Sequence, residues 1–333
     1  DGRLNIYGLQ ALAMATIVEA GEVLIRRRVR RAEDGLPLPL QLQVLEPDFL
    51  DTNVDGPLGN GNYAVQGIEF DLRGQRVAYY LFDQHPGDMR GFSGYRGNRV
   101  SADFVTHVYR VDRPGQVRGV TWFAPVITRL HDLADLSDAQ LMKQKIAACF
   151  AAFIKDNGQG ESYAQQPAGP DGAPVTNAYP IETFEPGMIE RLGEGEDISF
   201  ATPPQSQDFG PYSMLVLREI ATGMNIPYEA MTGDLTGVNF SSGRMGWLEF
   251  QRAVEGWRWN MLIPGMMDPV MRWANEAVRA VTMSSEPYRV DCTPPRREMI
   301  DPANDIRAAQ QAIRSGLSSR SSEVRKLGYE PED

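Results

Sequence analysis

The order of apolar and polar residues predicts a mixed α+β region over roughly the first 112 residues. Residues 4–20 repeat at helical spacing and predict an amphipathic helix. The positions that share one of its faces are Leu9, Leu12, Ala13, Thr16 and Ile17. Beyond this helix the pattern becomes strand-like over Val23–Val29, and further strands are predicted over Leu40–Val44, Ile68–Asp71, Val77–Phe82 and Val105–Arg110. A Gly-containing turn at residues 72–76 joins two of these strands into a predicted hairpin.

The rest of the chain is predicted to be mainly helical. The longest pattern runs from Thr121 to about Lys155, with Pro125 tolerated in the first turn. A continuous helix of this length would span roughly 50 Å. Further helices are predicted over Phe209–Met224, over Ser241–Val281 with interruptions at Pro264 and Pro269, from Asp301 and Pro302 to Gly316, and in a last segment that ends at Gly328. Between them, Asp156–Pro180 is predicted to be an exposed loop and Ile181–Pro204 to form short strands and turns.

Composition limits the class of protein without identifying it. With 333 residues, 42% of them hydrophobic, the chain can bury a sizeable core. Two cysteines are too few for a disulfide framework, which makes a reducing compartment the default, and Cys149 is predicted to be a small core residue. No apolar run approaches the roughly 20 residues of a membrane helix. Because the chain starts at Asp1, we expect it to be part of a longer protein.

The formal net charge of −11 bears on binding to nucleic acids. Proteins that hold duplex DNA tightly are usually basic, because neutralising phosphates supplies most of their affinity. The acidic balance therefore argues against a sequence-specific DNA-binding protein. It does not argue against a channel through which DNA must slide.

Residue types that carry catalysis do not form a recognisable motif. The three histidines are far apart in the sequence: we expect His107 to be a half-buried packing residue and His131 to be solvated or interhelical, and His85 has no partner at metal-ligand spacing. The glycines of Gly56–Gly61 predict an ordinary loop. The acidic cluster within residues 182–197 falls in turn-rich sequence and predicts a solvated loop. We therefore predict no enzyme activity, no metal and no cofactor.

Two further groups of side chains are conspicuous. Arg26, Arg27 and Arg28 form a basic run on a predicted strand, which suits contact with a neighbouring subunit or with phosphate, and we favour the subunit contact. Four tryptophans recur along the predicted helical stretch 241–281, and we expect most of them to pack in a helical core. They are Trp247, Trp257, Trp259 and Trp273.

The most informative segment is Thr232–Phe250, a loop with glycines and an aromatic residue near its tip, followed by a serine pair and an amphipathic helix. Together with other motifs in the same order, it resembles the portal proteins of lambda-type tailed phages. The other motifs are Gly21–Arg28, Pro39–Glu46, Gly67–Asp71, His85–Asp88, Arg113–Val120, Glu185–Met188, Ile226–Glu229 and Gly316–Arg320. The resemblance covers nearly the whole chain. One departure is Gly243, which follows the serine pair and is expected to loosen the first turn of the helix.

The resemblance implies an α+β portal fold with named parts. In order, these are an α+β wing (1–119), a first stem helix (120–155), a Gly/Pro-rich clip (156–207), a second stem helix (208–231), a tunnel loop (232–241), a channel-lining helix (242–283) and a helical crown (284–333). It also implies a function: one subunit of a ring, twelvefold in this family, at one vertex of the capsid. DNA would pass through the ring during packaging and ejection, and the ring would serve as the head–tail connector platform.

The resemblance further implies partners and site residues. The partners are other copies of the chain, duplex DNA held non-specifically, the terminase large subunit, head-completion or adaptor proteins and the major capsid protein, within a virion assembled in the host cytoplasm. The DNA-facing residues of the tunnel loop would be Thr236, Gly237, Val238, Asn239, Phe240, Ser241, Ser242 and Arg244. Arg26, Arg27 and Arg28 would lie at the subunit interface.

Two other classes of protein remain open at this stage. An acidic metal-dependent hydrolase or nuclease predicts turnover that requires a divalent cation and carboxylates that converge on one pocket. A monomeric adaptor module predicts that no ring forms at any concentration. Neither accounts for the ordered set of motifs.

Overall fold

The computed structural model describes residues 3–88, 96–148, 152–156, 196–200, 209–283 and 301–329, together with residues 286, 288, 290, 292, 293 and 295. The chain divides into two compact units. One unit comprises residues 1–125 and 221–333, and the other comprises residues 126–220.

The first unit begins with the predicted amphipathic helix, α1 (Ile6–Ala20). Asn5 caps its N-terminus by accepting the N–H of Gly8 at 2.9 Å. Leu9, Ala13 and Ile17 are buried, as predicted, but Leu12 is 42% exposed. The helix ends at Gly21, whose φ of 90° requires a residue without a side chain.

A three-stranded antiparallel sheet follows, with β1 (Glu22–Val29) between β2 (Leu40–Leu45) and β8 (Val105–Tyr109). A second antiparallel sheet has strands in sequence order: β3 (Gly56–Pro57), β4 (Tyr63–Val65), β5 (Ile68–Phe70), β6 (Arg76–Leu81) and β7 (Asn98–Ser101). The predicted hairpin is confirmed as β5–β6. Short 3₁₀ turns lie at Ala32–Asp34 (η1), Pro47–Phe49 (η2) and Ala102–Phe104 (η3).

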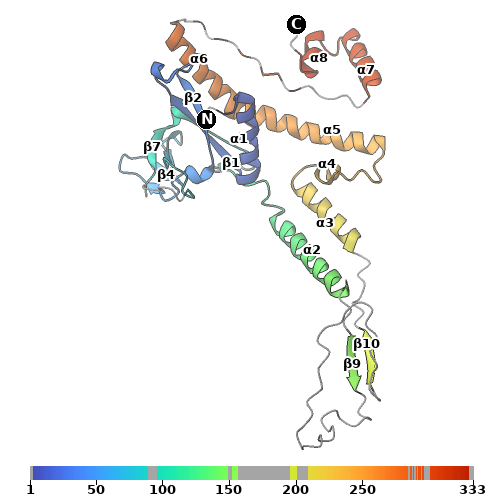
Figure 1. The fold of residues 1–333 in the computed structure, drawn as a ribbon. Helices are drawn as coiled ribbons and strands as arrows, with labels where there is room; N and C mark the ends of the chain where they lie inside the picture. Colours follow the sequence, from blue (N-terminus) through green and yellow to red (C-terminus); the bar gives the residue numbers. More distant parts are fainter. Residues whose placement is uncertain are drawn as a thin grey trace, which may run out of the picture. The chain divides into compact units, whose positions relative to one another are not determined.

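Strand β1 lies between two apolar clusters because its side chains alternate in direction. Val23 and Ile25 belong to a cluster with buried residues of α1 and of the later helices. Leu24 points to the opposite face and joins a second cluster with residues of the five-stranded sheet. The first half of β1, the middle strand of its sheet, is therefore buried on both faces (Figure 1).

After the short helix α4 (Tyr228–Thr232), the first unit continues as α5 (Phe240–Trp257), a π-helix (Arg258–Met267) and α6 (Asp268–Thr282). The predicted interruption at Pro264 is wrong, since Pro264 lies inside the π-helix and helical structure continues through it. Proline has no N–H, so widening of the helix accommodates the missing bond without a break. Pro269 lies in the first turn of α6, where proline is tolerated.

The C-terminal helices agree with the sequence prediction. Helix α7 (Pro302–Arg314) is capped by the Asp301 side chain, which accepts the N–H of Asn304, and Gly316 follows it with a φ of 74°. Helix α8 (Arg320–Lys326) follows after a short turn.

The second unit contains α2 (Ile127–Ala148), most of α3 (Phe209–Gly223), and the antiparallel pair β9 (Ala152–Asp156) and β10 (Glu196–Phe200). Helix α3 confirms its prediction. The predicted helix from Thr121 to Lys155 is wrong at both ends: α2 spans 22 residues, about 33 Å, and β9 replaces its last part. Thr121 and Trp122 bond back to the Val18 carbonyl, which keeps them out of the helix.

Candidate functional site

The segment from α4 to α5 is a short loop between two capped helix ends. Helix α4 ends at Gly233, which adopts a φ of 71° and donates its N–H to the Glu229 carbonyl at 2.9 Å. The loop then occupies residues 233–239, and α5 begins at Phe240. The predicted loop over residues 232–241 is therefore too long. Phe240, Ser241, Ser242 and Arg244 belong to the first turns of α5.

Asp234 organises the first half of the loop. One of its carboxylate oxygens accepts the backbone N–H of Thr236 at 3.0 Å and the Thr236 hydroxyl at 2.5 Å. The other lies 3.2 Å from the Tyr228 hydroxyl, which donates to it. Thr236 is thus held in a turn that the Asp234 side chain closes. These hydrogen bonds restrain the loop, although its two glycines predict a loosely restrained backbone.

The second half of the loop is a helix cap. Asn239 accepts the N–H of Ser242 at 2.8 Å, and the Ser242 hydroxyl accepts the N–H of Asn239 at 3.2 Å, which completes a capping box. Gly243 donates its N–H to the Asn239 carbonyl at 2.9 Å, so the first turn is closed rather than loosened. A Cβ atom on Gly243 would lie 3.1 Å from Val238, which shows how closely Val238 covers this turn.

The loop residues differ in what they present to solvent. Leu235 is 69% exposed, and Thr236, Gly237 and Ser241 are also exposed. Asn239 and Ser242 are exposed as well, but their polar groups are engaged in the cap. Arg244, one turn into α5, lies 2.9 Å from Asp305 of α7 and forms an ion pair with it. The charge of Arg244 is therefore neutralised by a carboxylate of the same chain.

The three arginines of β1 have different environments. Arg27 forms an ion pair with Glu276 of α6 and lies over the ring of Phe104. Arg28 donates to the Gln43 side chain across the β1–β2 pair at 2.9 Å. Burial lowers the pKa of Arg26 from its usual value, and the nearby charge of Arg28 acts in the same direction. Only part of this basic run is thus available to a partner.

A buried charge network that the sequence did not indicate lies at the start of β1. Glu22 is 1% exposed, and one of its oxygens lies 2.9 Å from His107 Nε2, while the other accepts from Arg118 at 2.6 Å. The backbone N–H of Gly119 also donates to Glu22. Burial opposes ionisation of Glu22, but the bonds from His107 and Arg118 outweigh it and lower the pKa of Glu22 to about 2.

The residue His107 is partly buried, as the sequence predicted, and its side chain is completely buried. Burial lowers the pKa of His107, and its Nδ1 atom is buried without a hydrogen-bond partner. Both observations favour a neutral ring with the proton on Nε2, donated to Glu22. The network joins β1, β8 and the segment that precedes α2.

A second buried carboxylate holds the five-stranded sheet together. Glu69 on β5 is fully buried and accepts two bonds from Arg99 of β7, the shorter at 2.7 Å. Asn60 and Asn62 donate to the same carboxylate at 2.9 and 2.6 Å. The bonds from Arg99 outweigh the cost of burial and lower the pKa of Glu69 to about 2. Both buried glutamates therefore serve the fold.

The other two histidines lie near the surface. His131 is solvated, as predicted, with its Nε2 atom 3.6 Å from Asp135. The Nε2 atom of His85 lies 3.2 Å from Glu46 and 3.6 Å from Asp48, a set of side chains that could hold a metal ion. However, His85 Nδ1 accepts the N–H of Gly87 at 3.0 Å, which places the ring proton on Nε2. Metal binding at Nε2 would require that proton to move and the Gly87 bond to break.

Of the four tryptophans predicted to pack in a helical core, two are packed and two are exposed. Trp273 is 1% exposed and donates its ring N–H to the Asp103 carbonyl, and the ring of Trp257 lies 4.6 Å from that of Trp122. The predicted packing role is confirmed for these two. Trp247 and Trp259 are instead 42% and 52% exposed.

Several sequence predictions lie outside the described residues. These concern Cys149, the loop within residues 157–180 and the acidic cluster at residues 182–194. Among the helices that the structure describes, none combines the length and apolar character needed to cross a membrane.

The sequence matches the family described as phage portal protein, lambda family, over residues 1–258. Among curated proteins, it is 26% identical over 351 residues to the probable portal protein of Halomonas phage phiHAP-1, which covers 100% of this chain and 64% of the relative. It is 22% identical over 307 residues to portal protein B of Escherichia phage lambda, covering 81% of this chain and 56% of the relative. The chain thus spans less than two thirds of the length of each of these relatives, 64% and 56%.

Solved structures support the fold. The neck of the native GTA particle computed with C12 symmetry contains a chain with a TM-score of 0.53 and 16% identity, which covers 99% of this chain and 82% of its own length. The neck of the empty GTA particle computed with C6 symmetry contains one with a TM-score of 0.50 and 17% identity, with coverages of 96% and 78%. The predicted α+β portal fold is therefore confirmed.

Proposed function

Because this chain belongs to the lambda family of phage portal proteins, we propose that it is one subunit of a ring that conducts duplex DNA at one vertex of a capsid. The observation that carries the proposal is the family match over residues 1–258, which includes the loop 233–239 and the start of α5. The GTA necks with a similar fold were computed with C12 and C6 symmetry, which supports a ring of identical copies, twelve in number.

The portal family is structural, and we propose that this chain has no hydrolytic activity and that its function is that of a virion component. The two buried glutamates support this, since each is enclosed by the fold and accepts hydrogen bonds from an arginine and from amide N–H groups. A nuclease or hydrolase would need carboxylates free to bind metal and substrate. Incubation with DNA or nucleotide and Mg²⁺ or Mn²⁺ should give no turnover above a heat-treated control, and cleavage that co-purifies with the chain would contradict the proposal.

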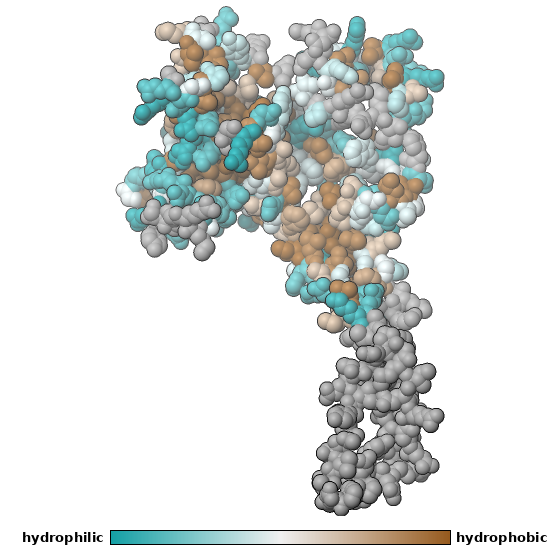
Figure 2. Space-filling model, viewed as in Figure 1, coloured by the Kyte–Doolittle hydropathy of each residue, from teal (hydrophilic) through white to brown (hydrophobic). Residues whose placement is uncertain are grey.

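We assign the parts of the portal fold to this chain by the family pattern. Residues 1–119 would form the wing, α2 and α3 the stem helices, the residues between these two helices the clip, the loop 233–239 the tunnel loop, α5 through α6 the channel helix and residues 284–333 the crown. The clip would receive the terminase large subunit during packaging and head-completion proteins afterwards, and the major capsid protein would surround the ring, which forms in the host cytoplasm. Helices α2 and α3 carry exposed apolar side chains that suit packing against other chains (Figure 2).

The loop 233–239 would face the DNA. Its exposed residues include Leu235, Thr236 and Gly237, which can touch a duplex without reading its sequence. Arg244 is paired with Asp305, so little positive charge lies near the loop to retain phosphate. Weak attraction is what a channel that lets DNA slide requires.

Electron microscopy of the purified protein in negative stain tests the proposal directly. We expect rings with a central hole, and image classes with twelvefold symmetry. If the protein stays monomeric at all concentrations while its circular dichroism spectrum shows that it is folded, the result would instead support an adaptor module.

A further inference from the structure

The carboxylate of Asp234 joins helix α4 to the tip of the loop 233–239. One of its oxygens accepts the backbone N–H of Thr236 at 3.0 Å and the Thr236 hydroxyl at 2.5 Å, and the other accepts the Tyr228 hydroxyl at 3.2 Å. The backbone N–H of Asp234 donates to the Thr232 hydroxyl at 3.2 Å, and that hydroxyl donates to the Tyr228 carbonyl at 2.9 Å. These bonds form a closed path from Tyr228 to Asp234 and back, which we call the Asp234 circuit.

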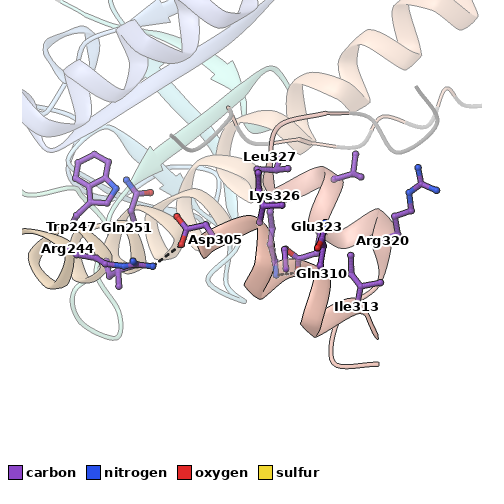
Figure 3. Close-up of a pocket in the computed structure, with 14 residues that line it drawn as sticks. Arg244, Trp247, Gln251, Asp305, Gln310, Ile313, Arg320, Glu323, Lys326 and Leu327 are labelled. Atoms are coloured by element: carbon purple, nitrogen blue, oxygen red, sulfur yellow. Dashed lines mark hydrogen bonds and ion pairs between the residues drawn. The ribbon is translucent and has the colours of Figure 1, made fainter. Parts of the chain in front are cut away.

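The backbone that follows the tip of the loop is also held in place. The N–H of Val238 donates to the Leu235 carbonyl at 3.2 Å, and Asn239 caps the N-terminus of α5. One turn farther along α5, Arg244 forms an ion pair with Asp305 of α7 at 2.9 Å (Figure 3). Leu235, the residue at the tip, therefore lies between two hydrogen-bonded segments of backbone.

Leu235 combines this restrained backbone with an exposed side chain, since 69% of the residue is accessible to solvent. A side chain whose backbone is already ordered loses less conformational entropy on contact with another surface than one on a loose loop. Gly233 and Gly237 supply no such order, because glycine adopts many backbone conformations. The order must come from the hydrogen bonds, and on the α4 side of the tip Asp234 makes them.

Two possible roles of Asp234 make different demands on its side chain. To repel phosphate by its charge, the carboxylate would have to face the DNA. The structure instead engages both carboxylate oxygens with donors of the same chain, on Thr236 and Tyr228. An asparagine could serve the same partners, because its carbonyl oxygen can accept from Thr236 and its amide can donate to the Tyr228 oxygen. The two roles are therefore separable by substitution.

We propose that Asp234 is a positioning residue, which fixes Leu235 for apolar contact with the duplex through its hydrogen bonds rather than through its charge. This inference rests on the function proposed above, in which the loop 233–239 faces DNA. An apolar side chain can press against the sugars and base edges of any sequence, because it makes no hydrogen bond to a particular base. The Asp234 circuit would thus set how firmly each subunit touches DNA as it passes.

Hydrogen exchange of the purified protein tests the circuit. The amides of the loop 233–239 should exchange about tenfold faster in Asp234→Ala than in the parent, and at the parent rate in Asp234→Asn. Asp71→Ala is the matched control, because Asp71 also closes an exposed turn by accepting the N–H groups of Arg73 and Gln75. This control should leave the exchange of the loop unchanged. Equal exchange in Asp234→Ala and the parent would overturn the inference.

DNA retention then separates position from charge. Asp234→Ala should form rings of normal size that hold less nuclease-protected DNA per particle, whereas Asp234→Asn should hold as much as the parent. Tyr228→Phe keeps the carboxylate of Asp234 but removes one bond of the circuit, so we expect a smaller loss of DNA and a smaller rise in exchange.

Two results would overturn the inference while leaving the proposed function intact. One is a full genome in Asp234→Ala particles despite faster exchange of the loop. The other is a loss of DNA in Asp234→Asn as large as that in Asp234→Ala, together with parent-like exchange, which would assign the effect to charge. A parent protein that forms no rings would instead contradict the proposed function, and with it any contact of Leu235 with DNA.

Discussion

At the scale of single residues, the described part of the chain contains two buried, hydrogen-bonded glutamates that sequence reasoning did not single out. Glu22 meets partners 85 and 96 positions away, so nothing in its local sequence indicates them. Its position at the start of a strand is visible in the pattern, but its burial is not. The role of His107 was missed for the same reason: an alternating strand predicts half-burial, and only the packed fold places Glu22 beside the ring.

Replacing Glu22 by glutamine should destabilise the subunit by about 3 kcal/mol at pH 7, because the pKa of Glu22 falls from 4.5 to about 2 on folding and each unit is worth about 1.4 kcal/mol. Thermal or urea unfolding measures this loss. Glu249→Gln is the matched control, since its pair with Arg252 is exposed and surface pairs contribute about 0–1 kcal/mol. Equal stabilities of the two variants would show that the network does not stabilise the fold.

The same pKa shift predicts how stability depends on pH. A depressed pKa means that the unfolded chain takes up the proton first as the pH falls, so stability is complete above about 4.5 and is lost as the pH approaches 2. Glu69 contributes in the same window because its pKa is also about 2. The slope of unfolding free energy against pH between these limits should be shallower in Glu22→Gln. A parallel slope would contradict the assignment.

At the scale of elements, apolar periodicity predicted what each helix and strand is, but not all of their ends. Helix α1, the β5–β6 hairpin, α3 and the capped start of α7 follow from local patterns. Strand β9 does not, because its ladder partner β10 lies about 40 residues farther along the chain. The π-helix across Pro264 was equally invisible, since a proline in sequence indicates a break and the surrounding packing instead allows a wider turn.

The crossing of two segments near β1 depends on glycine at two positions. A Cβ atom at Gly119 would overlap the carbonyl of Gly21, and Gly21 itself has a φ of 90°. We expect Gly119→Ala to cost more than about 2 kcal/mol, because the Gly119 N–H to Glu22 is lost when the segments move apart. Gly59→Ala, where the added atom meets open space, should change stability by less than about 0.5 kcal/mol. Chemical denaturation measures the free energy of unfolding of both variants. Equal values for Gly119→Ala and Gly59→Ala would contradict the prediction.

Deleting Leu235 to Val238 should separate ring assembly from DNA handling. The deletion removes the exposed tip of the loop, while α4 and the Asn239–Ser242 cap of α5 remain on either side. We therefore expect rings of normal size in electron microscopy and reduced packaging or retention of DNA, measured as nuclease-protected genome per particle. Mutant particles that hold a full genome like the parent would contradict a role of the loop in the channel.

At the scale of the whole molecule, charge is unevenly distributed along the chain. Residues 126–220 contain 6 basic and 14 acidic residues, a net charge of −8 out of the total of −11. In a ring of twelve, this segment would form a strongly acidic zone. DNA carries one charge per about 1.7 Å of its axis, so in the proposed channel such a zone would repel DNA from all sides and would favour sliding over binding. It also suits partners with a basic surface.

The basic run on β1 gives the last prediction, which concerns contacts between subunits. Arg27 already pairs with Glu276 in its own chain, so reversing the charge of Arg27 alone would destabilise the subunit as well as any contact between subunits. We therefore expect Arg26→Glu with Arg28→Glu to shift rings toward smaller species in light scattering, since several weak pairs per ring act together. The exchange Arg27→Glu with Glu276→Arg restores the internal pair with inverted charges and should keep both the fold and the ring. The opposite result would be rings that survive the Arg26 and Arg28 reversals but fall apart on the Arg27–Glu276 exchange. It would place the intersubunit contact at Arg27 and would contradict a contact through Arg26 and Arg28.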